Sequence, residues 1–294
     1  MNLMKFKKIY FFISSFVIIP GLISLLLFGL KPAIDFTGGS VVELHFLDQE
    51  KFANYSEQNL KDSLSGLYEI DTIQNSGEQK ITLKGKEISN QEKDNAVTKL
   101  AESYGQIDVL RFETIGPILG AELLKKTLTA ILLVASIITF FVWKQFDELK
   151  YGLCAVLAML HDSLVLIGSF SLLGHFFNVE VDVLFVTALL TTLSFSVHDT
   201  IVVYDRIREL KRKHARYSFD QIANAAVWET LGRSINNSMT IIIMLLALAI
   251  LGGASIHWFV MALLIGSITG TYSSTFVAVP LLTVWDKVFT KKKA

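Results

Sequence analysis

The chain has 294 residues, of which 52% are hydrophobic and 18% charged, and its mean hydropathy is +0.48. Soluble domains carry about 25% charged residues, so this composition excludes an ordinary soluble enzyme. The formal net charge is zero, which gives no reason to propose nucleic acid as a partner, and the single cysteine excludes a disulfide framework within the chain.

Long apolar segments dominate the chain. About 20 helical residues cross a hydrocarbon core of about 30 Å, so each such segment predicts a transmembrane helix. We predict six spans, at residues 9–30, 127–143, 151–174, 182–204, 237–253 and 257–285. Residues 1–30 would form the cytoplasmic N-terminus and the first span, and residues 123–294 a bundle of the other five.

The distribution of Lys and Arg predicts the orientation. The segment 205–236 holds seven of them, whereas 175–181 and 252–256 hold none. Cytoplasmic loops carry an excess of Lys and Arg, so we expect both termini and a loop at 205–236 to be cytoplasmic. Within this loop, Ser218 and Gln221 fit a capping box. They predict a helix over about 219–231 that ends at Gly232 and lies along the membrane surface.

Residues 31–122 form the one long polar stretch, with 9 basic and 16 acidic residues. Alternation at 40–47 predicts a strand. Residues 67–74, 79–84 and 107–115 are strand-like, and 55–66 and 89–105 predict helices. We expect a turn at residues 75–77. The order βαββαβ is typical of a ferredoxin-like domain. The predicted fold is therefore a polytopic α-helical membrane protein with one α+β domain on the outer side.

Ionisable residues within spans need an explanation, because each costs roughly 2.5–3.5 kcal/mol at mid-membrane. Asp199 lies about two turns, or about 10 Å, inside the fourth span. Thr192 and Ser196 share its helix face, and His198 is adjacent. Arg233 opens the fifth span at a similar depth and cannot practically lose its proton. We predict proton transport by Asp199 beside Arg233; a structural carboxylate and a snorkelling arginine are the alternatives.

The pair His161–Asp162 lies at the middle of the third span. The sequence leaves two roles open for this pair: a second proton-relay group, or a polar pair that holds helices together. The spacing of metal sites such as HExxH is absent from the sequence, and so is a nucleophile or ligand set at helical spacing. We therefore expect neither a metal site nor catalytic activity.

Glycine residues indicate a structural role for two further segments. A short motif follows the first span directly: Asp35, Phe36, Thr37, Gly38 and Gly39. Its paired glycines permit a tight turn or a close backbone approach, so we predict a structural hinge. Gly266 and Gly270 in the last span form GxxxG, which is typical of a closely packed helix face.

Four motifs in order carry a resemblance over the whole chain: DFTGGS, GPILG, SVHDTIVVYDRIRE and ETLGRSINNSMT. The chain resembles the SecD/SecF family of bacterial protein-export membrane proteins, and within it the SecF branch. Asp199 and Arg233 match that family's proton-path residues, whereas His198 stands where the family often has Asn.

The resemblance implies an accessory subunit of the Sec protein translocase in the bacterial cytoplasmic membrane. SecD would be its partner, alongside the SecYEG translocon, YajC, YidC and the translocating preprotein. The proton gradient would supply the energy, with no cofactor. The alternative is a stand-alone proton-coupled transporter of small molecules, of the resistance-nodulation-division type.

Overall fold

The computed structural model describes residues 2–53, 55–77, 79–146, 148–214 and 216–290. The chain divides into two compact units. One comprises residues 1–31 and 129–294 and is helical; the other, Pro32–Leu128, contains the sheet.

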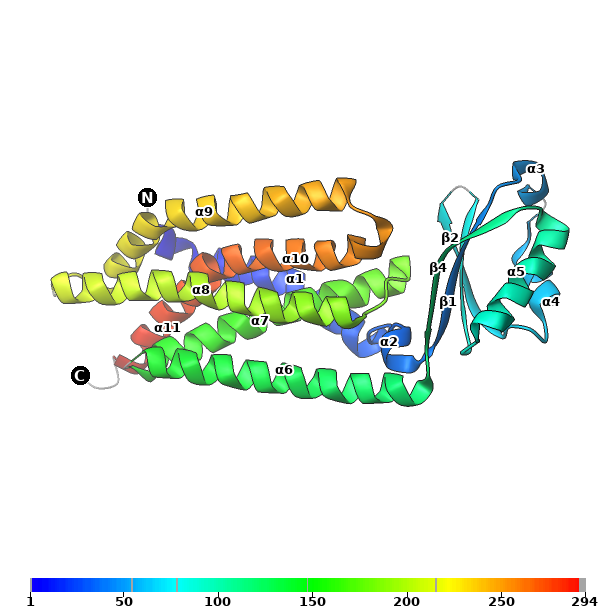
Figure 1. Ribbon diagram of the computed structural model, residues 1–294. Coiled ribbons are helices and arrows are strands. Elements are labelled where there is room, and N and C mark those ends of the chain that lie inside the picture. The colour runs from blue at the N-terminus through cyan, green and yellow to red at the C-terminus, as the bar shows by residue number, and fades with distance from the viewer. Residues whose placement is uncertain (1, 54, 78, 147, 215, 291–294) are drawn as a thin grey trace. The chain divides into compact units, whose positions relative to one another are not determined.

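The described residues contain six helices long and apolar enough to cross a membrane, which confirms the predicted number (Figure 1). The first joins a short 3-10 turn, η1 (Leu3–Phe6), to α1 (Lys7–Phe28). The next four are α6 (Pro117–Gln145), α7 (Leu149–Phe177), α8 (Val183–Lys213) and α9 (Phe219–Leu251). The last consists of α10 (Ala254–Ser273), the π-helical turn η2 (Ser274–Ala278) and α11 (Val279–Thr290).

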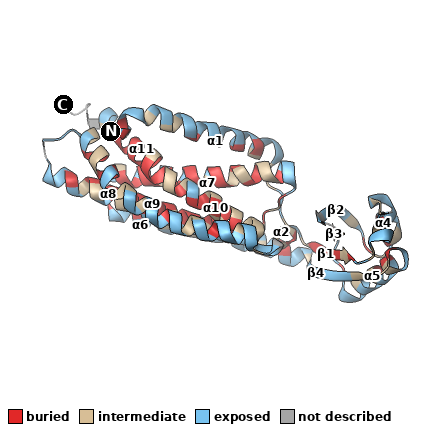
Figure 2. Cartoon of the chain, turned by 90° about the horizontal axis from the view of Figure 1, so that it is seen from above, coloured by how far each residue is buried: buried red, intermediate tan, exposed pale blue. Residues whose placement is uncertain are grey.

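The spans differ in how much of their surface the chain itself covers (Figure 2). Helices α7 and α8 and the composite last span are mostly buried, whereas α1, α6 and α9 are mostly exposed. Apolar surface exposed in this way is stable only against lipid or other membrane helices. The chain therefore has three inner spans and three peripheral ones.

Residues 178–182 make a short connection between α7 and α8. Asn178 ends α7 in the left-handed conformation, at φ 55°, which asparagine tolerates better than most residues. Asp182 caps α8 by accepting a hydrogen bond from the backbone N–H of Phe185 at 2.7 Å. The two helices are thus joined with their ends capped.

The loop predicted at 205–236 is mostly helical in the structure. Helix α8 continues to Lys213, and α9 runs without interruption from Phe219 to Leu251, so a surface helix ending at Gly232 was wrong. The capping box of Ser218 and Gln221 is present. One glycine costs a helix only about 1 kcal/mol, which the turns on either side of Gly232 outweigh.

The second unit holds a four-stranded antiparallel sheet in the order β2-β3-β1-β4. Its strands are β1 (Gly39–Phe46), β2 (Ile70–Gly77), β3 (Lys80–Gly85) and β4 (Ile107–Ile115). Its helices are α2 (Ile34–Thr37), α3 (Gln49–Phe52), α4 (Glu57–Leu64) and α5 (Asn90–Tyr104). Leu60, Leu64 and Leu100 from α4 and α5 pack on sheet residues such as Leu44 and Ile81.

The predicted order of strands and helices in this unit is confirmed, with two differences. The short helices α2 and α3 were missed. The turn expected at residues 75–77 was also placed wrongly, because β2 extends to Gly77, which pairs with Lys80 after a register irregularity. Gly77 has φ 137°, a conformation that residues with a side chain rarely adopt, and this freedom accommodates the irregularity, so that β2 still pairs with β3 at Gly77.

Candidate functional site

Asp199 lies on the inner side of α8, where only 7% of its surface is exposed. Its carboxylate accepts a hydrogen bond from the hydroxyl of Ser234 on α9 at 2.5 Å. The bond joins two consecutive spans through residues that are 35 positions apart. A carboxylate buried at this position is costly unless it is hydrogen-bonded or neutral.

Arg233 precedes Ser234, and it lies close enough for its charge to act on Asp199 without forming an ion pair with it. Successive residues of a helix are about 100° apart around its axis, so Arg233 and Ser234 point in different directions. The side chain of Arg233 is exposed, and among the described residues it forms no ion pair within 4.0 Å. The chain by itself thus brings Asp199 to Ser234 and leaves the guanidinium on the outer surface of α9. His198 is likewise exposed.

The polar stripe of α8 packs against α10. Thr192, Ser196 and Asp199 are all buried, as expected for one helix face. Gly266 and Gly270 allow this approach, since a Cβ at Gly266 would lie 2.1 Å from Thr192 Cγ2. The close-packing role predicted for the GxxxG pair is confirmed.

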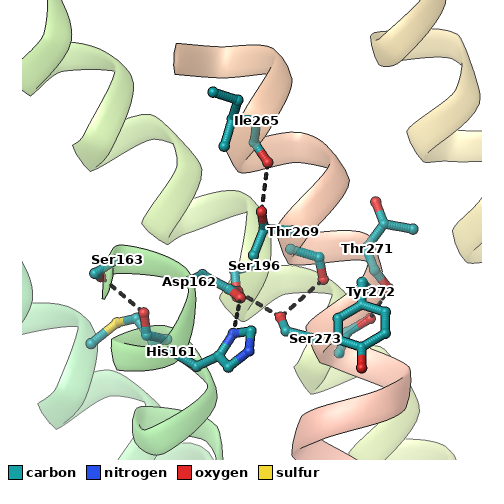
Figure 3. Close-up of polar contacts among 12 residues, drawn as sticks. His161, Asp162, Ser163, Ser196, Ile265, Thr269, Thr271, Tyr272 and Ser273 are labelled. Atoms are coloured by element: carbon teal, nitrogen blue, oxygen red, sulfur yellow. Dashed lines mark hydrogen bonds and ion pairs between the residues drawn. The ribbon is translucent and has the colours of Figure 1, made fainter. Parts of the chain in front are cut away.

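Asp162 on α7 is the centre of a second buried cluster (Figure 3). Its Oδ1 lies 2.8 Å from Nδ1 of His161. Its Oδ2 accepts hydrogen bonds from Ser273 Oγ of α10, at 2.6 Å, and from Ser196 Oγ of α8. The carboxylate thus joins the three inner spans, which matches the packing alternative.

Sequence reasoning missed the two serines that hold these carboxylates. Ser234 stands next to the arginine that attracted attention, and Ser273 lies among several small residues of the last span. Serine is common on packed membrane helices, so its type alone does not single it out. The one available signal was the clustering of hydrogen-bonding residues in the stretch RSINNS.

The motif Asp35–Gly39 forms the short helix α2, which contains Asp35, Phe36 and Thr37, and a turn at Gly38 and Gly39. Both glycines have positive φ, 73° and 121°. A Cβ at Gly38 would lie 2.7 Å from the Cα of Pro117, at the start of α6. The expected tight turn and close approach are both present, and the contact is with the helix that follows the sheet.

Comparison with known proteins identifies the family. The model of "Protein export membrane protein SecD/SecF, C-terminal" matches residues 95–288, and that of "SecD/SecF GG Motif" matches residues 23–46. The chain belongs to the SecD/SecF family. The first match contains Asp162, Asp199 and Arg233, and the second contains Gly38 and Gly39.

Relatives within the SecD/SecF family match nearly the whole chain. The chain is 41% identical to the protein translocase subunit SecF of Thermobaculum terrenum, over 97% of this chain and 94% of that protein. It is 35% identical to the subunit of the same name from Anaerolinea thermophila, with the same coverage. A Bacillus subtilis protein translocase subunit named SecDF is 34% identical over 95% of this chain and 37% of its own length.

A solved structure agrees with the fold. The crystal structure of SecDF, a translocon-associated membrane protein from Thermus thermophilus, superposes with a TM-score of 0.84 at 28% identity. The match covers 98% of this chain and 39% of that one. The SecD/SecF chain described here thus corresponds to a part of a longer relative.

Proposed function

We propose that this chain is an accessory subunit of the Sec protein translocase. Together with a SecD-type partner, it would use the proton-motive force to promote the passage of preproteins across the cytoplasmic membrane and their release. Its relatives are named protein translocase subunit SecF, and in two matched proteins the name is SecDF. Those fused relatives support a SecD-type partner; SecYEG, YajC and YidC remain expected neighbours.

The observation that carries the proton-driven step is the position of Asp199. It is a buried carboxylate on a membrane-spanning helix, and its partner in this chain is a neutral hydroxyl. A carboxylate in that setting can be held by the hydroxyl in either charge state, because a hydroxyl both donates and accepts. Uptake of a proton would change the charge between α8 and α9, and hence their packing.

The exposed Arg233 supports an obligate partner. A guanidinium on the outer surface of a span is costly in lipid, and Asn236, Asn237 and Thr240 on α9 are exposed with it. Polar groups at a membrane helix surface are satisfied by other helices. A SecD-type helix bundle that covers α9 would supply those contacts, and Arg233 would then interact with groups of both chains.

The proposed orientation in the membrane rests on the distribution of Lys and Arg along the chain. Both termini would face the cytoplasm, and the sheet-containing unit would lie on the outer side as a ferredoxin-like domain. Its sheet order β2-β3-β1-β4 and its element order support that class. One elementary charge that crosses about 100 mV releases about 2.3 kcal/mol, which shifts a conformational equilibrium about fifty-fold.

The test uses membrane vesicles that contain this chain, its partner and the translocon, with export measured with and without a proton gradient. Asn resembles the protonated form of Asp but cannot ionise. We expect Asp199→Asn to assemble normally with the partner and to abolish the gradient-dependent part of export.

The matched control is Asp205→Asn, which makes the same change on the same helix at an exposed residue that pairs with Arg208 at 3.4 Å. It should retain gradient-dependent export. Full gradient dependence in Asp199→Asn would exclude the proton role and leave a structural subunit. Gradient-driven extrusion of small molecules by the chain alone would favour the stand-alone transporter instead.

A further inference from the structure

His161 and Asp162 form a buried ionisable pair that the Asp199 site does not use. His161 is 8% exposed and Asp162 3%. Asp162 accepts hydrogen bonds from His161, Ser196 and Ser273, and in the described parts of the chain no Lys or Arg forms an ion pair with it. With a neutral imidazole and an ionised carboxylate, the pair carries one uncompensated negative charge.

The hydrogen bonds indicate which ring nitrogen of His161 carries the hydrogen. The Oδ1 atom of Asp162 faces Nδ1 of His161 at 2.8 Å, and an ionised carboxylate can only accept, so Nδ1 carries the hydrogen. In the neutral ring the other nitrogen, Nε2, then holds a lone pair. Nε2 is buried and has no hydrogen-bond partner among the described residues. An unpartnered buried acceptor beside a negative charge is a place where a proton is stabilised.

Helix α1 brings a hydroxyl to the level of His161. Three pairs of residues show how α1 lies along α7, each separated by 147 positions: Ser24–Ser171, Lys31–Asn178 and Gly21–Gly168. The same offset relates Ser14 to His161. Ser14 is buried, and its hydroxyl lies beside that of Tyr272 from α10. A hydroxyl at this level can donate to the neutral Nε2 or accept from its protonated form.

Few other ionisable groups come near the pair. From α10, the ring of Tyr272 stacks on that of His161 at 6.5 Å between centroids, and its hydroxyl donates to the Tyr10 carbonyl of α1. From α8, the nearest ionisable residues in sequence are His198 and Asp199, beyond Ser196. The η2 turn, STFVA, has no ionisable side chain, and Asp286 of α11 is paired with Lys150.

We propose that His161 and Asp162 form a second proton-binding site in the bundle, with Nε2 of His161 as the atom that takes the proton. A proton from water adds to the Nε2 lone pair, the Nδ1–H bond to Asp162 is retained, and the charge of the pair changes from −1 to 0. The site is separate from Asp199, which bonds to α9, whereas Asp162 bonds to α8 and α10.

The two sites share helix α8. Ser196, which donates to Asp162, lies three residues before Asp199, so a change of charge at either site acts on the same helix. A proton on His161 strengthens the bond from Nδ1–H to Asp162 and draws the negative charge of the carboxylate toward the ring, which weakens its bonds to Ser196 and Ser273 and loosens α8 and α10 from α7. The coupling of this site to export rests on the proposed function, whereas the binding of the proton does not.

The test is a histidine titration by nuclear magnetic resonance of the full chain with its partner in lipid nanodiscs. The chain has six histidines, labelled with ¹⁵N, and the signal lost in His161→Gln identifies His161. Spectra are recorded over about pH 5–8, the range in which an imidazole usually changes charge, and the proposal requires Nε2 to gain a proton in it. In Asp162→Asn the transition should move to lower pH, because the negative charge beside the ring is gone.

His198→Gln is the matched control, since it removes an exposed histidine and should leave the His161 transition in place. If His161→Gln fails to assemble, substitution of the other five histidines leaves the signal of His161 alone. An Nε2 that keeps one protonation state throughout this pH range overturns the proposal, and so does a midpoint unchanged by Asp162→Asn.

The Asp199→Asn variant separates the two proposals. We expect His161 to titrate in it although gradient-dependent export is lost. Retained export in Asp199→Asn would refute the proton-driven function and leave the His161 site standing. In otherwise unaltered protein, the pH profile of export should show a step at the His161 midpoint that is absent from His161→Gln; an identical profile in that variant would refute the coupling.

Discussion

The contact between α8 and α10 allows a prediction at Gly266. An added Cβ would lie 2.1 Å from Thr192 Cγ2, whereas carbon atoms in contact are about 3.5 Å apart, so Gly266→Ala requires a displacement of about 1.4 Å. Rotation of Thr192 is opposed by its hydrogen bond to the Leu189 carbonyl at 2.9 Å. Overpacking of this kind costs about 1–3 kcal/mol.

Gly270→Ala is the matched control, because its Cβ would meet Phe195 and Ser196 at 3.4 Å, close to ordinary contact. Both substitutions gain the same helix propensity, about 1 kcal/mol. The difference between their stabilities therefore measures the contact alone. We expect Gly266→Ala to be less stable than Gly270→Ala by about 1–3 kcal/mol, measured as unfolding in lipid nanodiscs followed by tryptophan fluorescence.

A second substitution tests the cause. Thr192→Ala removes Cγ2, so the nearest remaining atom to the new Cβ is Thr192 Cβ at 2.6 Å. The displacement then falls to about 0.9 Å, and we expect the double variant to recover part of the lost stability. Equal unfolding midpoints for Gly266→Ala and Gly270→Ala, or no recovery in the double variant, would refute the packing argument.

Two further predictions concern the outer surface of α9 and the sheet. Arg233→Lys should assemble with the partner but lose part of gradient-dependent export, because a lysine lacks the planar, forked guanidinium; export equal to that of the unaltered protein would remove the pairing argument. In the second unit, Tyr68 is buried and donates to the Ser40 carbonyl at 2.8 Å, and its burial raises its pKa above the ordinary value of 10.0. A folded-state pKa above the unfolded one gives stability that is present below about pH 10 and is lost as pH rises, so amide exchange in this unit should accelerate above pH 10, and less so in Tyr68→Phe.

Much of the architecture could be predicted because it depends on local patterns. Apolar runs of about 20 residues identified the spans, and the residues of the Ser218–Gln221 capping box identified the start of α9. The face shared by Thr192, Ser196 and Asp199 followed from helix geometry alone. Each of these features is encoded within one continuous segment of the chain.

The partners of the two carboxylates could not be predicted in this way. Ser234 is 35 residues from Asp199, and Ser273 is 111 residues from Asp162. Which helices meet, and at what rotation, depends on the packing of whole surfaces. The same limitation explains Gly232, where local propensity suggested an end and the neighbouring turns continue the helix.

The glycine turn after the first span has a consequence for how the sheet-containing unit is built. Gly38 lies against Pro117, Gly120 against Gly38, and β1 pairs with β4 along its length. The two ends of the sheet-containing segment are therefore held side by side, by these close contacts and by the pairing of β1 with β4. A change in the length of the segment between β1 and β4 would leave both ends in place.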